Sequence, residues 1–306
     1  MQRAYISKLL EIAEKDHNVL HLLADSGTGF DEMFRRNFPD QIYNFGIAEE
    51  NMVGAAAGLA RLGKIPFVYT AGAFLAYRSF EFIRDDVCLQ NLNVKIVGMG
   101  AGFAWSSLGP THHTTEDLGA LRTLPNLVIL SPASPKQVAA CTQFMYDYQG
   151  PVYMKIGMNN EKEFFNDNYL LPIMQNEVIY QGGTIPLYTT GSILEEAYDA
   201  AILLKNKDIN LSVINVHTVK PFDKRSVIEW SRKTNIIFTV EEQSIIGGIG
   251  SAISEIVAEE GLAVKVKRIG LNDMFGIGYG TQKEVRAQNN LDANGIVKTI
   301  IRYLNE

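Results

Sequence analysis

The sequence predicts an α/β protein with two domains, each a mostly parallel sheet flanked by helices. Short apolar runs alternate with segments of helical periodicity along the whole chain, which is the order typical of parallel sheets. A length of 306 residues allows two domains of roughly 100–200 residues each. Residues 159–175 mix charged, aromatic and amide side chains without periodicity, and they separate two such series. We therefore expect one domain over residues 1–172 and a second over residues 173–306.

The first domain is expected to be built on short apolar strands with helices between them. The strands are Asn18–Ala24, Ile65–Thr70, Val94–Met99, Leu127–Leu130 and Val152–Ile156. Helical periodicity covers Glu49–Leu62, Tyr77–Gln90, Glu116–Leu124 and the segment after Pro135. This last helix has Pro135 at its first position, with Ser134 as the expected cap and Gln137 completing a capping box.

The second domain repeats the alternation of strands and helices. Its strands are Ile185–Thr190, Leu211–Val216, Asn235–Glu241 and Val264–Ile269. Its helices start at Ile193, after Pro221, within the glycine turn 247–250 and at Asp292. Ser192, with Glu195 three residues later, predicts another capping box.

The composition describes an ordinary soluble globular protein, with 46% hydrophobic and 20% charged residues. A net charge of −6 without a block of like charges excludes nucleic acid and anionic membranes as expected partners. The chain has no apolar run of the roughly 18 residues that a membrane span needs, and its N-terminus lacks a signal-peptide core. Cys88 and Cys141 fall in helical patterns and are interpreted as reduced core residues, so we expect a cytoplasmic location.

The stretch 44–59 pairs two consecutive acids, Glu49 and Glu50, with a run of small residues over 54–58. Small residues let a helix approach another backbone or a flat ligand closely. An acid at the head of a helix either stabilises the helix dipole or works as a buried acid. The residues alone leave both interpretations open.

Two further stretches have candidate side chains. Residues 74–82 hold several aromatic side chains, which form either core or a stacking platform for a flat ring. His112 and His113 follow a predicted strand, where α/β proteins place ligand-facing loops. Adjacent side chains point apart, so a shared metal is disfavoured, whereas one histidine as a proton shuttle or hydrogen-bond donor to substrate is favoured.

The remaining candidates have ordinary interpretations. His17, His21 and His217 are isolated and are interpreted as surface or core residues. The glycine turn 247–250 lacks the third glycine of a dinucleotide fingerprint, because Ile253 stands there. We therefore interpret it as a tight packing turn.

Together these stretches resemble the C-terminal half of transketolase and its relatives, enzymes that depend on thiamine diphosphate. The resemblance spans nearly the whole chain, and the motifs occur in the family's order. They are G-I-x-E at 46–49, A-F-L at 73–75, G-P-T-H at 109–112, E-D-L at 116–118, V-E-E-Q-S-I-I-G-G-I-G-S at 240–251, V-K-R-I-G at 266–270, F-G at 275–276 and L-D-A-N-G-I at 291–296.

The resemblance implies a pyrimidine-binding domain followed by a transketolase C-terminal domain. It implies that Glu49 hydrogen-bonds the aminopyrimidine ring of the cofactor and so favours the tautomer that removes the thiazolium proton. Phe74, with Tyr77 and Phe80 nearby, would hold the face of that ring. His112 would line the substrate channel and hydrogen-bond the donor sugar. The roles of Glu50, where many relatives have histidine, and of His113 stay open.

The family's Gly-Asp-Gly motif, which holds the cofactor diphosphate through Mg²⁺, does not occur in this sequence. The resemblance therefore implies one subunit of a split transketolase, inactive alone. An N-terminal transketolase-like subunit with Gly-Asp-Gly would supply the Mg²⁺ ligands, and no metal ligand is expected in this chain. We expect a homodimer within a heterotetramer that acts on a small sugar.

Two departures from the family bear on the substrate. Leu108 stands where relatives have an acid that contacts a donor hydroxyl, and Met158 where they have an arginine that binds the sugar phosphate. A thioether cannot pair with a phosphate, although Lys155 or Arg78 would be able to compensate. A modified sugar is therefore expected. The alternatives are a β subunit of a 2-oxo acid dehydrogenase or a deoxyxylulose-phosphate-synthase-like enzyme, and a catalytically idle assembly partner.

Overall fold

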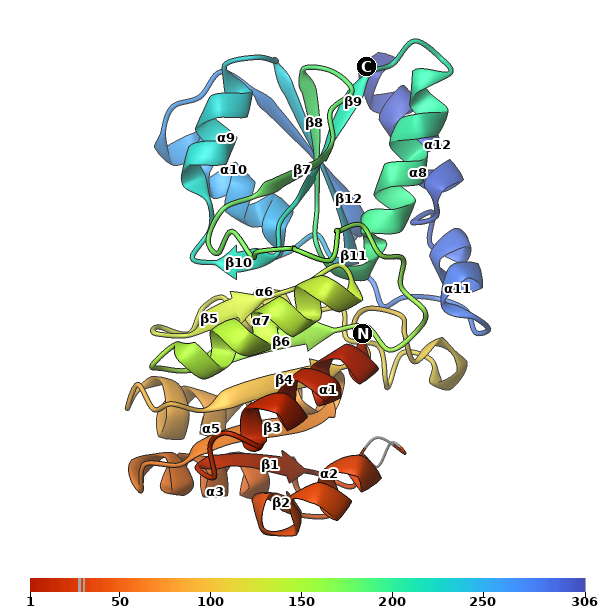
Figure 1. The fold of residues 1–306 in the computed structure, drawn as a ribbon. Coiled ribbons are helices and arrows are strands. Elements are labelled where there is room, and N and C mark those ends of the chain that lie inside the picture. The colour runs from red at the N-terminus through yellow and green to blue at the C-terminus, as the bar shows by residue number, and fades with distance from the viewer. Residues whose placement is uncertain (27–28, 30, 306) are drawn as a thin grey trace. The chain divides into compact units, whose positions relative to one another are not determined.

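A computed structural model describes residues 1–26, 29 and 31–305 of the chain (Figure 1). It divides into two compact units. Unit 1 comprises Met1–Ala101 and Ala120–Leu171, and unit 2 comprises Gly102–Gly119 and the chain from Pro172 onwards. Each unit holds a mostly parallel sheet flanked by helices, which confirms the predicted fold class. The domain boundary after residue 172 stays a prediction.

Unit 1 contains a sheet of short, mostly buried strands in the order β5-β6-β4-β3-β1-β2. All of its pairings are parallel. The strands are β1 (Val19–Leu23), β2 (Ile42–Asn44), β3 (Ile65–Ala71), β4 (Lys95–Met99), β5 (Val128–Leu130) and β6 (Val152–Ile156). In β1, β4, β5 and β6 every residue is buried, as expected for parallel strands covered on both faces.

The helices of unit 1 form two clusters. α1 packs against α7, and α3 packs against β3, α4 and α5 (Figure 1). The bounds are α1 (Gln2–Ala13), α2 (Asp31–Asn37), η1 (Pro39–Gln41), α3 (Glu49–Arg61), α4 (Gly72–Arg78), α5 (Phe80–Phe82), the π-helical η2 (Ile83–Cys88) and α7 (Pro135–Asp147).

Unit 2 contains a five-stranded sheet in the order β12-β11-β8-β9-β7, in which only the β7–β9 pairing is antiparallel. Its strands are β7 (Glu177–Tyr180), β8 (Ile185–Thr189), β9 (Leu211–Asn215), β11 (Ile236–Ser244) and β12 (Lys265–Leu271), and the short β10 (Thr218–Lys220) follows β9. Figure 1 shows this sheet between the α9–α10 pair and the α8–α12 pair, and the two helices of each pair pack together. The helices are η3 (Ser106–Leu108), η4 (Gly191–Ile193), α8 (Leu194–Lys205), α9 (Lys224–Ser231), α10 (Ile249–Glu259), α11 (Gln282–Gln288) and α12 (Ala293–Asn305), while α6 (Asp117–Leu121) starts in unit 2 and ends in unit 1.

One expected helix has a different form. The single helix predicted over Tyr77–Gln90 begins earlier, at Gly72, and is interrupted at Ser79. Its last part is a π-helix that buries Ile83, Val87 and Cys88. The wider π turn places positions 83 and 88 on one buried side, whereas the α-helical period used for the prediction does not.

Both predicted capping boxes are wrong. The Ser134 hydroxyl donates to Glu163 instead of capping α7, and Glu163 itself accepts from the Lys136 backbone N–H at 2.9 Å. The Ser192 hydroxyl donates to Glu242, and α8 begins after a 3₁₀ turn with Ile193 at its cap. In both places a distant carboxylate competes for the serine.

Two other expectations can be compared with the fold. Cys88 and Cys141 are buried and form no disulfide with a residue that the structure describes, in agreement with reduced core residues. None of the helices in residues 1–26, 29 and 31–305 has the length and apolar content that a membrane span requires. Elements that the sequence patterns did not predict include α1, α2, α11, β2 and β7, which are short or amphipathic pieces at edges and surfaces.

Candidate active site

A short loop between β2 and α3 positions Glu49 in unit 1. The Asn44 side-chain oxygen accepts hydrogen bonds from the backbone N–H of Asp25 at 3.0 Å and of Gly46 at 2.9 Å. Gly46 has φ +69°, a left-handed conformation that favours glycine. This turn starts α3 at Glu49, so the carboxylate stands in the first helical turn, where the helix dipole favours an acid.

Glu49 and Glu50 have different surroundings although they are adjacent. The side chain of Glu49 is 2% exposed and accepts a hydrogen bond from Arg78 Nη1 at 2.5 Å. Glu50 is half-buried and makes no hydrogen bond or ion pair with a residue that the structure describes. Within those described residues Arg78 is the single hydrogen-bond partner of Glu49.

The predicted aromatic platform lies partly beside this acid. The Arg78 guanidinium lies 5.0 Å from the ring centroid of Phe74, so Glu49, Arg78 and Phe74 form one contiguous group. Phe74 is half-buried on α4, and Tyr77, also on α4, is 39% exposed. Phe80 is half-buried at the start of α5. The pairing of Arg78 with Glu49 was not predicted from the sequence. The two residues are 29 positions apart, and no local pattern links them.

The loop that contains His112 belongs to unit 2 and is closed on itself. Gly102 and Thr114 exchange two backbone hydrogen bonds of 3.0 and 3.1 Å, which form an isolated antiparallel bridge. The backbone N–H of Phe103 donates to the Glu242 carboxylate at 3.0 Å, and the Ser106 hydroxyl donates to the Gly280 carbonyl at 2.7 Å. These contacts hold residues 102–114 as a defined loop on the C-terminal part of the chain.

The two histidines of this loop differ in exposure and in hydrogen bonding. His112 is half-buried; its backbone N–H donates to the Gly109 carbonyl, and its Nδ1 lies 2.9 Å from the Thr111 hydroxyl. His113 is 3% exposed, packs edge-on against Phe103, and neither of its ring nitrogens hydrogen-bonds to a residue that the structure describes. Burial lowers the pKa of His113 below its ordinary value, although Glu242 opposes the shift. His113 is therefore a neutral packing residue, and His112 is the better placed of the two to meet a substrate.

A buried ion pair supports the loop. Glu242, at 7% exposure, accepts from Arg286 Nη2 at 2.6 Å and from Gln282 Nε2 at 2.9 Å. Burial raises the pKa of Glu242, but Arg286 and the hydrogen bonds outweigh burial, so the pKa lies below its ordinary value. A side chain at Gly102 would place its Cβ 2.5 Å from the Glu242 carboxyl carbon, so only glycine permits this approach.

The glycine turn before α10 is a packing turn, as its incomplete fingerprint predicted. The Glu241 carboxylate accepts from the backbone N–H of Ile249 at 2.6 Å and of Gly250 at 2.8 Å. A Cβ on Gly248 would lie 2.0 Å from the same carboxylate. The helix N-terminus that a nucleotide phosphate would need is already occupied by an acid of this chain.

Leu108 and Met158 are uncharged, so another side chain would have to replace the acid and the arginine that relatives have at these positions. Leu108 is 47% exposed on η3, and Met158 is half-buried just after β6. Arg78 is engaged by Glu49, and Lys155 is 5% exposed within β6. The idea that Arg78 or Lys155 compensates for the absent arginine therefore has no support in the geometry.

The residues fit the pyrimidine half of thiamine diphosphate. Glu49 is a buried carboxyl that pairs with Arg78, and Arg78 also lies over the Phe74 ring, a combination of acid and aromatic face that suits a heteroaromatic ring. In the described ranges there is no group of three or more His, Cys, Asp or Glu that could hold a metal ion.

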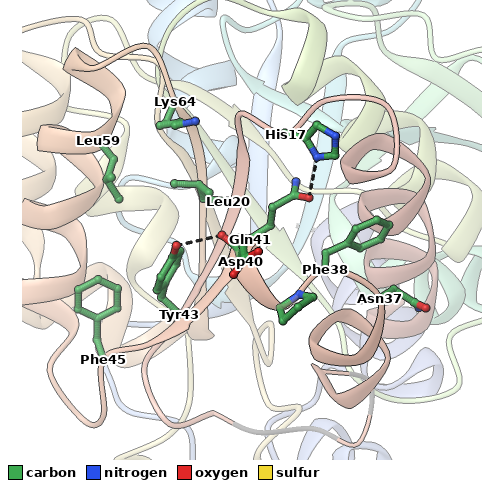
Figure 2. A pocket seen from close by; sticks show the side chains of 11 residues that line it. His17, Leu20, Asn37, Phe38, Asp40, Gln41, Tyr43, Phe45, Leu59 and Lys64 are labelled. Atoms are coloured by element: carbon green, nitrogen blue, oxygen red, sulfur yellow. Dashed lines mark hydrogen bonds between the residues drawn. The ribbon is translucent and has the colours of Figure 1, made fainter.

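Unit 1 also contains a cavity of about 760 Å³ beside β2 that none of the predicted site residues lines (Figure 2). Its polar side chains bond within the unit. Gln41 Nε2 donates to the Val19 carbonyl at 2.9 Å, and the Tyr43 hydroxyl donates to the Asp40 carbonyl at 2.9 Å. We assign no chemistry to this cavity.

Comparisons with known proteins cover nearly the whole chain. The family "Transketolase, pyrimidine binding domain" matches residues 1–160, and "Transketolase, C-terminal domain" matches residues 175–296. An apulose-4-phosphate transketolase subunit of Actinobacillus succinogenes is 34% identical over 293 residues, which are 95% of this chain and 94% of that protein. A 6-deoxy-6-sulfo-D-fructose transketolase subunit of Clostridium sp. is 34% identical over 277 residues, 90% of this chain and 86% of that protein.

Two further similarities concern assembly and the alternative chemistry. A solved structure described as "Split gene transketolase, inactive beta4 tetramer" is 33% identical, with a TM-score of 0.90, and the match covers 99% of this chain and 98% of that one. The 1-deoxy-D-xylulose-5-phosphate synthase of Desulforudis audaxviator is 34% identical over 296 residues, 95% of this chain and 46% of that enzyme.

Proposed function

Because this chain belongs to the transketolase family, we propose that it is the C-terminal subunit of a split transketolase that acts with a diphosphate-binding partner. The carrying observation is the buried Glu49 carboxyl, paired with Arg78, in a chain that matches a transketolase subunit over 94% of that subunit's length. Enzymes of this family use thiamine diphosphate. We propose that Mg²⁺ and its ligands come with the partner, which has the Gly-Asp-Gly motif.

Within this proposal each predicted residue has a defined task. Thiamine diphosphate supplies the carbon nucleophile and electron sink for two-carbon transfer when it is bound. Glu49 holds a proton at the aminopyrimidine ring nitrogen, and Arg78 fixes the orientation of the Glu49 carboxylate. Phe74, with Tyr77 and Phe80, contacts the ring face. His112 donates a hydrogen bond to the donor sugar, which the Thr111 hydroxyl supports by orienting the imidazole.

The substrate we propose is a modified sugar. Leu108 cannot accept a hydrogen bond from a donor hydroxyl as an acid does, and Met158 cannot pair with a phosphate as an arginine does. Two relatives support this direction, because their names specify apulose 4-phosphate and 6-deoxy-6-sulfo-D-fructose. Two charged contacts worth roughly 1.5–3 kcal/mol each correspond to some two to four orders of magnitude in specificity for an ordinary ketose phosphate.

The assembly we propose is a homodimer of this chain within a heterotetramer. A 33% identical relative, described as an inactive β4 tetramer, supports both self-association of the lone chain and its inactivity. A closed symmetric dimer is the commonest homo-oligomer. Light scattering that finds a strictly monomeric chain, alone and with its partner, would count against this assembly.

Reconstitution tests the function. A candidate partner that contains Gly-Asp-Gly, sought first in the neighbouring open reading frames, is expressed, and the two chains are mixed with thiamine diphosphate and Mg²⁺. We expect ketol transfer in the mixture, none with either chain alone, and poor use of xylulose 5-phosphate with ribose 5-phosphate. Met158→Arg should improve the use of that pair. Efficient wild-type turnover of it would mean that the substrate is conventional.

A second candidate is a decarboxylating synthase, which the 34% identity to a 1-deoxy-D-xylulose-5-phosphate synthase favours. That match covers 46% of the enzyme, so it supports the C-terminal half alone. Release of carbon dioxide from a 2-oxo acid by the reconstituted pair, with no ketol transfer between sugars, would replace the first proposal by this one.

A further inference from the structure

An exposed apolar segment, Met274–Tyr279, follows β12 in unit 2. Four of its six residues are large and apolar, and they are exposed by 48% (Met274), 72% (Phe275), 54% (Ile277) and 65% (Tyr279). From the size of such side chains, the exposed apolar area is roughly 400–500 Å². Soluble monomers rarely expose contiguous apolar patches above a few hundred Å², and such patches mark interaction surfaces.

Hydrogen bonds hold this segment in place although its side chains are exposed. The Ile277 backbone N–H donates to Asn289 Oδ1 at 3.1 Å, and Asn289 Nδ2 donates back to the Ile277 carbonyl at 2.8 Å. The Gly280 carbonyl accepts from the Ser106 hydroxyl, and Thr281 then starts α11 with a complete capping box. The apolar side chains are therefore presented by an ordered backbone.

The segment lies directly on the loop that contains His112. A Cβ on Gly109 would lie 2.5 Å from Tyr279 Cε1, so the tyrosine ring rests on this glycine. A Cβ on Gly276 would lie 2.3 Å from the Phe103 ring and 3.3 Å from His113 Nδ1. A protein seated on the segment therefore also covers the His112 loop.

We propose that a second copy of this chain covers the segment Met274–Tyr279 when the diphosphate-binding partner is absent. The segment itself has no charged residue, so two copies can face each other there without local repulsion, despite a net charge of −6 per chain. This inference rests on the self-association of the lone chain proposed above, and it concerns the contact that the partner replaces, not the homodimer that persists within the heterotetramer. It adds the surface and its consequence. The consequence is that the lone assembly shields the candidate catalytic loop.

The area indicates how tight this contact is. Two copies of the segment bury roughly 800–1,000 Å² of apolar surface, whereas stable interfaces bury about 1,200–2,000 Å² in total. The segment is thus the centre of a modest, reversible contact. A reversible contact allows the partner subunit to displace the second copy.

Sedimentation equilibrium of the full chain tests the surface. Phe275→Ser with Ile277→Ser should raise the dissociation constant at least about tenfold, because large apolar residues at the centre of a contact dominate its affinity. The matched control is Leu62→Ser with Leu89→Ser, two positions 80% and 76% exposed in unit 1. It removes similar apolar area and should leave the constant unchanged. Circular dichroism and the melting temperature check that both variants fold.

Histidine labelling tests the consequence. Diethyl pyrocarbonate should modify His112 less as the concentration of wild-type chain rises, while the exposed His17 reacts equally at every concentration. In the Phe275→Ser/Ile277→Ser variant the concentration dependence at His112 should disappear. Self-association that both double variants weaken equally, or His112 labelling independent of concentration, would overturn the inference while leaving the proposed self-association intact. A wild-type chain that is monomeric throughout would overturn both.

Discussion

Glu49 and His112 are held in position in different ways. Glu49 stands at the start of a 13-residue helix, after a turn fixed by Asn44 and Gly46 close by in the sequence. The His112 loop is anchored by Glu242 and by the Gly280 carbonyl, through hydrogen bonds that span 139 and 174 residues. The acid therefore depends on local backbone geometry, and the histidine depends on the completed fold of unit 2. A substitution in the C-terminal part of the chain should therefore disturb the His112 loop and leave the position of Glu49 unchanged.

The largest effect is expected at Glu49. Replacing Glu49 by Gln keeps the shape and removes the proton donor, so activity of the reconstituted complex should fall by at least roughly 10²–10⁴-fold. Glu50→Gln is the matched control and should cost much less, because Glu50 is half-buried and makes no hydrogen bond within the described residues. Steady-state assays compare the two. Equal losses would show that the wrong carboxylate has been assigned.

The next effect concerns the anchor of the His112 loop. Glu242→Gln removes the short ion pair of the buried Arg286 and leaves it a longer one, to Glu196 at 3.7 Å. The cost should therefore approach that of a broken buried pair, about 3–5 kcal/mol of unfolding free energy. Urea unfolding measures this cost, and hydrogen exchange should rise over residues 103–114. The control is Glu229→Gln, which breaks an exposed pair with Arg225 and should change stability by less than about 0.5 kcal/mol. If the Glu242→Gln protein is as stable as this control, the His112 loop does not depend on Glu242 as proposed.

A smaller effect is expected from acid, which should lower the stability of unit 2 more than that of unit 1. Burial lowers the pKa of His217 to about 4 and also lowers that of His113, both in unit 2. Because these folded values lie below the unfolded value of 6.5, the stability is present above pH 6.5 and is lost as pH falls through the folded pKa. For His217 the loss at about pH 5 is about 2 kcal/mol.

Hydrogen exchange at about pH 7.5 and pH 5 checks this expectation. Protection should decrease in segments of unit 2 while β1 and α3 of unit 1 keep theirs. A His217→Gln variant should lose most of the difference between the two pH values. Earlier loosening of unit 1 in acid would contradict the assignment.

The same contrast explains how much the sequence predicted. The Glu49 helix entry, most strands and the packing role of the Gly247–Gly250 turn follow from periodicity, turn chemistry and an incomplete fingerprint, which are local signals. Ser134 and Ser192 fit the local pattern S-x-x-E/Q that favours a cap, yet each hydroxyl donates to a carboxylate from elsewhere in the chain, Glu163 or Glu242. No local pattern contains that information.

Long-range partners account for the rest of the candidate site. The pairing of Arg78 with Glu49 and the anchoring of Phe103 by Glu242 join residues 29 and 139 positions apart. The resemblance to a family identified the residues that face a cofactor, but not the groups that hold them. Those groups become visible only when the elements are packed.

The most direct test of the split-enzyme proposal is calorimetry of the purified chain with thiamine diphosphate and Mg²⁺. We propose that Glu49 and Phe74 of this chain hold the cofactor's ring and that the partner holds the metal of the diphosphate. We expect binding weaker than micromolar and no turnover for the chain alone, with tight binding restored when the Gly-Asp-Gly subunit is added. Micromolar or tighter affinity of the lone chain for the cofactor would contradict the proposal.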